Sequence, residues 1–513
     1  MYERFMEKAK QNDPKLFQTE HKTAHFGIPV PDNKEWFRYR FVKTEPPRSM
    51  SSGDEIYIDF GNHYTGYLSF TMNFVKQYPD APTRVYIKFA ENLYELATDY
   101  GTYEGEMSPT WFQQEIVYID NPSRVKISRR YAFRYVKLVV EAAPAPIYFE
   151  DFTVSAVSSA DITKCQPIDV EEQLWKLDQI GCRTLQNCMQ RILEDGPKRD
   201  RRLWLGDLRL QALTSYYTFQ SDEVIKRCLY LFAAYTDQGC RVPRDIFQST
   251  DETYCHKEWL ADYSLMFPIC LCDYYEHRKD EEIINDLFEL ADEQLKIAYQ
   301  ATDEGIVKDL EELVEWWAFI DWCDGLQKVT SMQGILLYAL KKMRWLCMET
   351  GRTEKAQVYE TYITELQQAA KEKLYDSENG YFVNRYDKFQ LSVHSQVWMI
   401  LGDVIQGDEA KQLLQNTLNN KEAKGAVTPY MHHYVVEALI HVGMKEEALE
   451  YIKGYWGKMA EYGADTYWEV FVPGNFEVSP YGDPIMNSCC HAWSCSVSYF
   501  IRKYFVSENE DIK

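Results

Sequence analysis

The first third of the chain alternates hydrophobic and polar residues in short runs. Turn residues separate the clearest of these runs, which lie at 57–74, 83–91, 115–120, 124–128, 130–142 and 146–159. In the second run, Val85, Ile87 and Phe89 fall on one side of an extended chain. A period of two, rich in β-branched and aromatic residues, is typical of half-buried strands. Many short strands at close intervals predict an antiparallel β-sandwich.

Near residue 165 the period of the pattern changes from two to that of a helix. Between 170 and 193, Leu174, Leu177, Ile180, Leu185 and Met189 form a helical stripe. Similar amphipathic stripes predict further helices near 206–220, 222–237, 257–276, 280–300, 329–350, 354–375, 392–405, 408–418, 428–442, 445–460 and 488–505. About twelve helices with mostly short connections pair naturally into six antiparallel hairpins.

The predicted hairpins show no sequence repeat of fixed period, which argues against a TPR- or HEAT-type solenoid. A closed (α/α)6 toroid buries both layers of hairpins without exposed ends. The sequence therefore predicts a multidomain β + α fold, in which an N-terminal antiparallel β-sandwich is followed by an (α/α)6 toroid. We expect the sandwich and an N-terminal extension at 1–162, the helical catalytic domain at 163–507 and a polar tail at 508–513.

The charge balance narrows the classes of partner. The net charge of −23 argues against nucleic acid or an anionic membrane surface as a partner, because both need clustered Lys and Arg. A small, neutral or cationic molecule fits better. The chain also holds 38 Tyr and 13 Trp, more than a generic core needs. Such an excess is frequent where sugars stack on aromatic rings, although aromatic helix packing explains it equally well.

Targeting and redox signals point to the cytosol. The N-terminus MYERFMEKAKQNDPK has no apolar h-region, and no apolar run approaches 18 residues. The chain has thirteen cysteines, which is an odd number, and without an export signal we expect them to be reduced thiols. Cys489, Cys490 and Cys495 beside His491 fit no standard zinc spacing, so we expect neither a metal site nor a cofactor.

Three long non-helical segments interrupt the helical region, at 194–205, 303–327 and 462–487. Each carries carboxylates close to tryptophan, as in DGPKRDRRLWLGD (195–207). Long irregular segments in a compact domain are usually functional. Glycoside hydrolysis needs one protonated and one ionised carboxyl group, and it benefits from aromatic faces against the sugar. Each single signal is weak, because an aspartate beside a tryptophan is more often a helix cap or a surface residue.

Two motifs give the sequence a family resemblance. DGPKRDRRLWLGD resembles the D-x-P-x-R-(D/E)-R…W-x-G-D segment of the family 78 glycoside hydrolases, the inverting α-L-rhamnosidases. GADTYWEVF resembles that family's G-A-T-T-x-W-E segment, and CHAW its later H-x-W/H-x-Y element. DFGNHYTGYLSF and RRYAFRYVKLVV look like the family's N-terminal β-sandwich, so the resemblance covers about residues 50–505.

The resemblance implies a hydrolase that releases a terminal α-L-rhamnosyl residue from short glycosides, with inversion. It places the general acid at Asp200 and the general base at Glu469. The residues that it implies for the substrate-binding site are Asp195, Arg199, Trp204, Asp207, Trp259, Asp321, Trp322, Trp468 and His491. In an inverting enzyme we expect the two catalytic carboxyl groups about 6.5–9.5 Å apart.

Some positions depart from the family pattern. Asp200 stands where most members have a glutamate, which leaves Asp195 or Asp207 as alternative acids. Leu203 stands where many members have glycine, and the C-terminal sandwich of many members is missing. The alternatives are a glycosidase, phosphorylase or lyase of the same fold for another sugar, and a non-catalytic carbohydrate-binding protein. A homodimer joined through the sandwich is one assembly that this layout allows.

Overall fold

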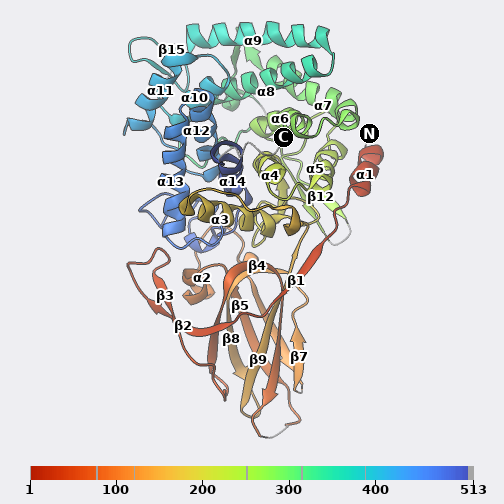
Figure 1. The fold of residues 1–513 in the computed structure, drawn as a ribbon, viewed down its shortest axis with the longest axis vertical. Coiled ribbons are helices and arrows are strands. Elements are labelled where there is room, and N and C mark those ends of the chain that lie inside the picture. The colour runs from red at the N-terminus through yellow and green to blue at the C-terminus, as the bar shows by residue number, and fades with distance from the viewer. Residues whose placement is uncertain are drawn as a thin grey trace.

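The computed structural model describes residues 2–506 except 77–78, 121, 250–251, 314–315 and 387–388. Figure 1 shows an elongated molecule, with helices gathered at one end and strands at the other. Helix α3 (Glu172–Cys188) lies across the boundary between the two parts. The last strand of the β domain ends at Ser158 and α3 begins at Glu172, so the passage between the two parts lies between these residues. The predicted polar tail, 508–513, lies outside the described residues.

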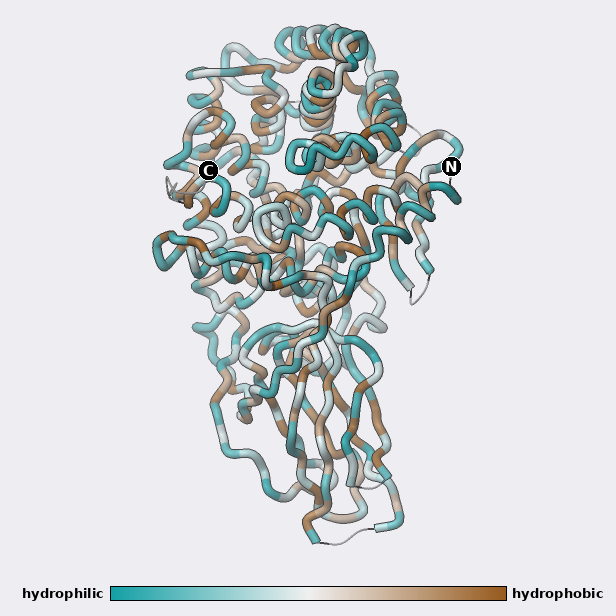
Figure 2. Tube along the Cα trace, turned by 45° about the vertical axis from the view of Figure 1, so that its right-hand side comes forward, coloured by the Kyte–Doolittle hydropathy of each residue, from teal (hydrophilic) through white to brown (hydrophobic). Residues whose placement is uncertain are grey.

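The β domain is one continuous antiparallel sheet of nine strands that folds around a hydrophobic core. Its strands are β1 (Phe17–His21), β2 (His25–Pro31), β3 (Tyr39–Lys43), β4 (Glu55–Phe74), β5 (Thr83–Ala90), β6 (Gln114–Ile119), β7 (Ser123–Lys126), β8 (Tyr131–Ala142) and β9 (Ile147–Ser158). The first half of β4 pairs with β8 and its second half with β9, with an irregularity between Asp59 and Tyr64. Alternating hydrophobic and polar residues along these strands are visible in Figure 2.

The helical domain pairs its helices as the sequence predicts. After α3 come α4 (Leu205–Tyr217), α5 (Asp222–Ala234), α6 (Ala261–Arg278), α7 (Glu281–Gln300), α8 (Val329–Glu349), α9 (Thr353–Lys373), α10 (Val393–Leu401), α11 (Gly407–Asn419), α12 (Pro429–His441), α13 (Lys445–Glu461) and α14 (Val497–Phe500). Neighbouring helices such as α6 and α7, or α8 and α9, pack against each other. The β-sandwich followed by an (α/α)6 domain is confirmed. No helix in the described ranges is both long and apolar enough to cross a membrane.

The last predicted helix, 488–505, begins later than its pattern indicates. Residues 488–491 are irregular, and a 3-10 turn at Ala492–Ser496 precedes α14 and a π-helical turn at Ile501–Phe505. The backbone N–H of Ser488 donates to Glu469, and that of His491 to Tyr467. These bonds join 488–491 to the segment that follows α13, so the segment cannot form helical bonds with itself.

The chain begins on the helical domain and not on the sheet. Helix α1 (Tyr2–Gln11) packs on α5, where Arg227 donates a hydrogen bond to the carbonyl of Ala9 at 2.9 Å. Strand β1 then leads down into the β domain (Figure 1). The N-terminal extension, expected together with the sandwich, thus lies against the helices, and the chain crosses between the two parts twice.

Candidate active site

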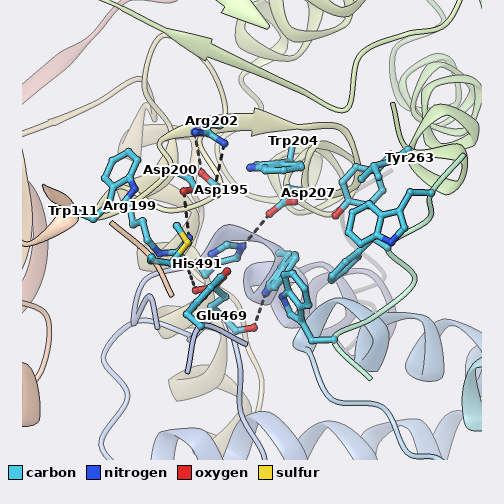
Figure 3. Close-up of a pocket in the computed structure, with 17 residues that line it drawn as sticks. Trp111, Asp195, Arg199, Asp200, Arg202, Trp204, Asp207, Tyr263, Glu469 and His491 are labelled. Carbon is cyan, nitrogen blue, oxygen red and sulfur yellow. Dashed lines mark hydrogen bonds and ion pairs between the residues drawn. The ribbon is translucent and has the colours of Figure 1, made fainter. Parts of the chain in front are cut away.

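A cavity of about 240 Å³ opens where the non-helical segments of the helical domain meet the β domain. It is smaller than the roughly 300–1,000 Å³ of sites for drug-sized ligands, so it suits a single sugar ring. Figure 3 shows carboxylates, arginines and aromatic rings turned into it. Eight of the eleven residues that we predicted for the site line this cavity: Asp195, Arg199, Asp200, Trp204, Asp207, Trp322, Glu469 and His491.

The segment 195–207 forms a closed loop at the cavity wall. The backbone N–H of Asp195 donates to the carbonyl of Arg202 at 2.8 Å, and the N–H of Arg202 donates to Oδ1 of Asp195 at 2.9 Å. Between them, Asp200 and Arg201 adopt left-handed φ angles of 62° and 53°. Non-glycine residues in this region are strained, and such strain is concentrated at functional sites. The loop holds the Asp200 side chain, about 13% exposed, at the cavity.

Glu469 lies buried on the segment after α13 and is held as an anion. Its Oε2 accepts hydrogen bonds from Arg199 at 2.5 Å and from the N–H of Ser488 at 3.0 Å, and its Oε1 accepts one from Tyr481 at 2.5 Å. Burial by itself raises the pKa of a carboxyl group, but Arg199, His491 and the hydrogen-bond donors outweigh it and lower the pKa of Glu469 to about 2. Glu469 is therefore ionised at neutral pH.

Arg199 links the two predicted catalytic carboxylates. One terminal nitrogen of its guanidinium lies 2.5 Å from Glu469, and the other lies 3.3 Å from Asp200. Because a guanidinium is a small rigid plane, the nearest oxygens of the two carboxylates are no more than about 8 Å apart. That limit excludes separations beyond about 12 Å and is compatible with the range for inverting hydrolysis.

Asp195 and Asp207 lie deeper in the wall than Asp200. Burial, followed by the charges of Asp200 and Asp207, raises the pKa of Asp195 well above its ordinary value. Burial also raises the pKa of Asp207, although His491, 3.2 Å away, opposes that shift. Burial disfavours the charged form of both carboxyl groups, which suits them to hydrogen bonding with a neutral, hydroxyl-rich ligand.

Two buried polar atoms at the cavity, Nδ1 of His491 and the indole nitrogen of Trp322, have no hydrogen-bond partner among the described residues. The other ring nitrogen of His491, Nε2, contacts Oδ1 of Asp207 at 3.2 Å. An unpaired buried polar atom costs about 1–3 kcal/mol, so such a group of atoms indicates a ligand that supplies the missing bonds. No group of three or more His, Cys, Asp or Glu side chains that could hold a metal occurs in the described part of the chain.

Three residues predicted for the site lie outside the cavity. Asp321 is buried and is hydrogen-bonded to His394, to the hydroxyl of Thr428 and to three backbone N–H groups. Trp468 stacks on Trp36 with ring centroids 5.8 Å apart. Trp259 lines a neighbouring groove. Neither Asp321 nor Trp468 lines the cavity, so a part for them in substrate binding stays a prediction.

Nine residues that line the cavity were not predicted as site residues: Met107, Trp111, Arg202, Leu260, Tyr263, Trp317, Phe319, Tyr481 and Trp493. Arg202, Trp317 and Trp493 lie inside or beside the motifs, so proximity along the chain was a usable signal. Met107 and Trp111 come from the β domain, where the sequence pattern gives no hint of a site.

Comparison with known proteins assigns the chain to a family. Residues 29–156 match the N-terminal domain of glycosyl hydrolase family 78 α-rhamnosidases. Residues 169–505 match the bacterial α-L-rhamnosidase six-hairpin glycosidase domain. The chain belongs to glycosyl hydrolase family 78. It is an α-L-rhamnosidase-type glycoside hydrolase, as the two motifs implied.

Solved family 78 structures resemble the whole chain. A rhamnosidase from Klebsiella oxytoca with rhamnose bound is 37% identical, with a TM-score of 0.94 over 98% of this chain and 99% of that one. The family 78 rhamnosidase of Bacillus sp. GL1 is 21% identical, with a TM-score of 0.75 over 90% of this chain and 49% of that one. At that identity the second match shows the fold alone. No curated protein sequence matches the chain significantly.

Proposed function

We propose that this family 78 hydrolase releases a terminal α-L-rhamnosyl residue from short glycosides with inversion, using Asp200 as general acid and Glu469 as general base. One observation carries the proposal: Arg199 holds the two carboxylates at one aromatic-walled cavity that fits a single sugar ring. The similar Klebsiella oxytoca protein, which is described as a rhamnosidase with rhamnose bound, supports the choice of sugar.

The reaction follows from these positions. Ionised Glu469 accepts a proton from a water molecule as that water attacks the anomeric carbon on the face opposite the leaving group. Asp200 donates its proton to the glycosidic oxygen as the bond from that oxygen to the anomeric carbon breaks. The products are β-rhamnose and the aglycone as its neutral alcohol, and exchange with solvent returns a proton to Asp200 and removes one from Glu469. Asp195, Asp207 and His491 are suited to hold the sugar hydroxyls.

Asp200 fits the acid better than its two neighbours do. It is the least enclosed of the three, whereas Asp195 and Asp207 are only 3% and 1% exposed. A general acid must reach an oxygen shared between the sugar and the aglycone, which lies toward the cavity mouth. Asp195 is the second candidate, because its raised pKa favours a proton that it could donate.

Proton NMR of the protein with methyl and 4-nitrophenyl α-L-rhamnosides tests the proposal. β-Rhamnose should appear first, and Glu469→Gln should lower kcat by about 10³-fold on both substrates. Asp200→Asn should lower kcat by about 10²–10⁴-fold on the methyl glycoside. The kcat of Asp200→Asn should fall much less on the nitrophenyl glycoside, because nitrophenolate is a good leaving group that needs no proton from the enzyme.

Asp151→Asn is the matched control for the acid, because Asp151 also has a left-handed φ but lies exposed in the β domain. Full activity of Asp200→Asn on the methyl glycoside would move the acid to Asp195. α-Rhamnose as first product would contradict inversion. Binding of rhamnose without turnover of any glycoside would favour a non-catalytic carbohydrate-binding protein.

We also propose that the enzyme works in the cytosol, since all thirteen cysteines are free thiols in the structure. The expected partner is a neutral small glycoside, in keeping with the net charge of −23. A homodimer through the sandwich stays a prediction, which light scattering on the purified protein checks.

A further inference from the structure

We infer that Trp111 and Met107 of the β domain form the leaving-group subsite of this enzyme, and that this subsite accepts a flat aromatic aglycone. The inference rests on the proposed function, because it takes Asp200 as the acid. Its first support is position. Of the described residues that line the cavity, Met107 and Trp111 alone come from the β domain.

Both residues lie on a long connection between neighbouring strands. Strands β5 and β6 pair as an antiparallel hairpin, yet residues 91–113 separate them. Hairpin loops are usually two to five residues long, and longer ones are often functional. This connection contains helix α2 (Leu93–Ala97) and two 3-10 turns, the second of which ends at Trp111.

The connection is anchored to the loops of the catalytic domain. The N–H of Glu106 donates to the carbonyl of Tyr481 at 2.9 Å, and Phe112 packs in one buried cluster with Ile485 and Met486. Tyr100 stacks on Phe112 with ring centroids 3.8 Å apart. Because Tyr481 also donates to Glu469, the segment that carries Trp111 is fixed relative to the predicted general base.

Trp111 lies at the end of the cavity where the leaving group must depart. In Figure 3, Trp111, Arg199 and Asp200 gather at one end of the cavity, and Tyr263 lies at the other. The acid protonates the glycosidic oxygen, so the aglycone extends from the Asp200 side. Asp195 and Asp207, the deeper carboxyl groups, leave the rhamnosyl ring on the inner side.

The chemistry of this wall selects the class of aglycone. A tryptophan and a methionine offer a flat, polarisable and uncharged surface, which suits an aromatic ring. Trp111 packs against the cluster of Phe112, Ile485 and Met486, yet it stays partly exposed and lines the cavity. A pyranose could also stack on the indole, but its hydroxyl groups would find no strong hydrogen-bond partner on Met107 or on the ring face of Trp111.

The test compares kcat/KM for phenyl α-L-rhamnoside, a rhamnosyl-glucose disaccharide and methyl α-L-rhamnoside. For Trp111→Ala we expect the ratio of phenyl to methyl glycoside to fall about tenfold relative to the wild type. The ratio of disaccharide to methyl glycoside should change less than threefold or so. Trp111→Phe retains a ring and should keep the phenyl-to-methyl ratio within about threefold.

Trp175→Ala is the matched control, because Trp175 is 48% exposed on α3 and lies outside the cavity. Thermal unfolding of each variant separates a folding defect from a lost contact. An equal loss on all three substrates in Trp111→Ala overturns the subsite, and an equal loss on phenyl glycoside and disaccharide overturns the aromatic class. A wild type that hydrolyses no rhamnoside overturns the proposed function itself, and this inference with it.

Discussion

The hydroxyl group of Tyr481 helps to keep Glu469 ionised. Its hydroxyl donates to Glu469 at 2.5 Å and is one of the causes that lower the pKa of Glu469 to about 2. A general base works only when ionised, so activity is lost as the pH falls through its pKa. In the wild type this acid limb of kcat/KM lies below about pH 4.

Tyr481→Phe should raise the pKa of Glu469 and move the acid limb to higher pH. At neutral pH we expect kcat/KM to fall no more than about tenfold, because Arg199 and Ser488 still hold the carboxylate. A pH–rate profile on an aryl rhamnoside measures both effects. Tyr254→Phe is the control, since it removes a hydroxyl bonded to the exposed Glu252 away from the cavity. An unchanged acid limb in Tyr481→Phe contradicts the role.

The motif residues predicted from sequence line the cavity, whereas residues predicted only because they adjoin such a position do so in part. Asp195, Asp200, Asp207 and Glu469 were found by motif and line the cavity. In Asp321-Trp322 and Trp468-Glu469, one partner lines the cavity and the other packs behind it. Neighbouring residues of an extended chain point to opposite sides, so a carboxylate beside a tryptophan rarely shares its environment.

At the scale of elements, Lys198 fixes the loop 195–202 to the β domain. Its buried ammonium lies 3.1 Å from the carboxylate of Glu95, which is in the first turn of α2. The same ammonium donates a hydrogen bond to the carbonyl of Ile485 at 3.0 Å. Removing one member of a buried ion pair leaves the other charge uncompensated, which costs about 3–5 kcal/mol. Lys198→Met should therefore lower the free energy of unfolding by about that amount, measured by urea denaturation.

The double variant Lys198→Met/Glu95→Gln completes the cycle. It should recover part of the lost stability, because Glu95 then carries no charge and Glu91, 3.9 Å from Lys198, still has His63 as a partner. Lys371→Met, at an exposed position near the end of α9, should change the free energy of unfolding by no more than about 0.5 kcal/mol. Strictly additive losses in the double variant would show that Lys198 and Glu95 do not interact.

Periodicity predicted the regular elements well and the irregular ones poorly. Strands β4 to β9 and the helices from α3 to α13 lie where their hydrophobic patterns indicate. Strand β2 (HFGIPVP) was not predicted, because two prolines interrupt its alternating pattern. The connection 91–113 has no clear period, and its place at the cavity depends on contacts with residues nearly four hundred positions away. Local pattern carries no information about such contacts.

At the scale of the whole molecule, buried charges join the two domains. His63 on β4 contacts Glu91 at 3.0 Å, and Glu91 accepts a hydrogen bond from the N–H of Cys489 at 2.6 Å. Burial opposes a charge on His63, but Cys490 and Glu91 raise the pKa of His63 to about 10. Helix α1, which precedes the first strand of the β domain, also packs on α5 of the helical domain. Neither domain can therefore unfold without breaking contacts with the other.

The full chain should therefore unfold in one transition, although its length would allow two. We expect the calorimetric and van't Hoff enthalpies to agree, and hydrogen exchange to show β8 and α4 opening together.

Glu91→Gln weakens the junction between the domains and should lower that single Tm by about 2–4 °C. Glu450→Gln, at a position 76% exposed on α13, should leave the Tm unchanged. If Glu91→Gln split the melt into two transitions, or moved only the strands, the domains would be independent folding units. The anchored cavity wall at Trp111 would then need contacts other than this junction to hold its place.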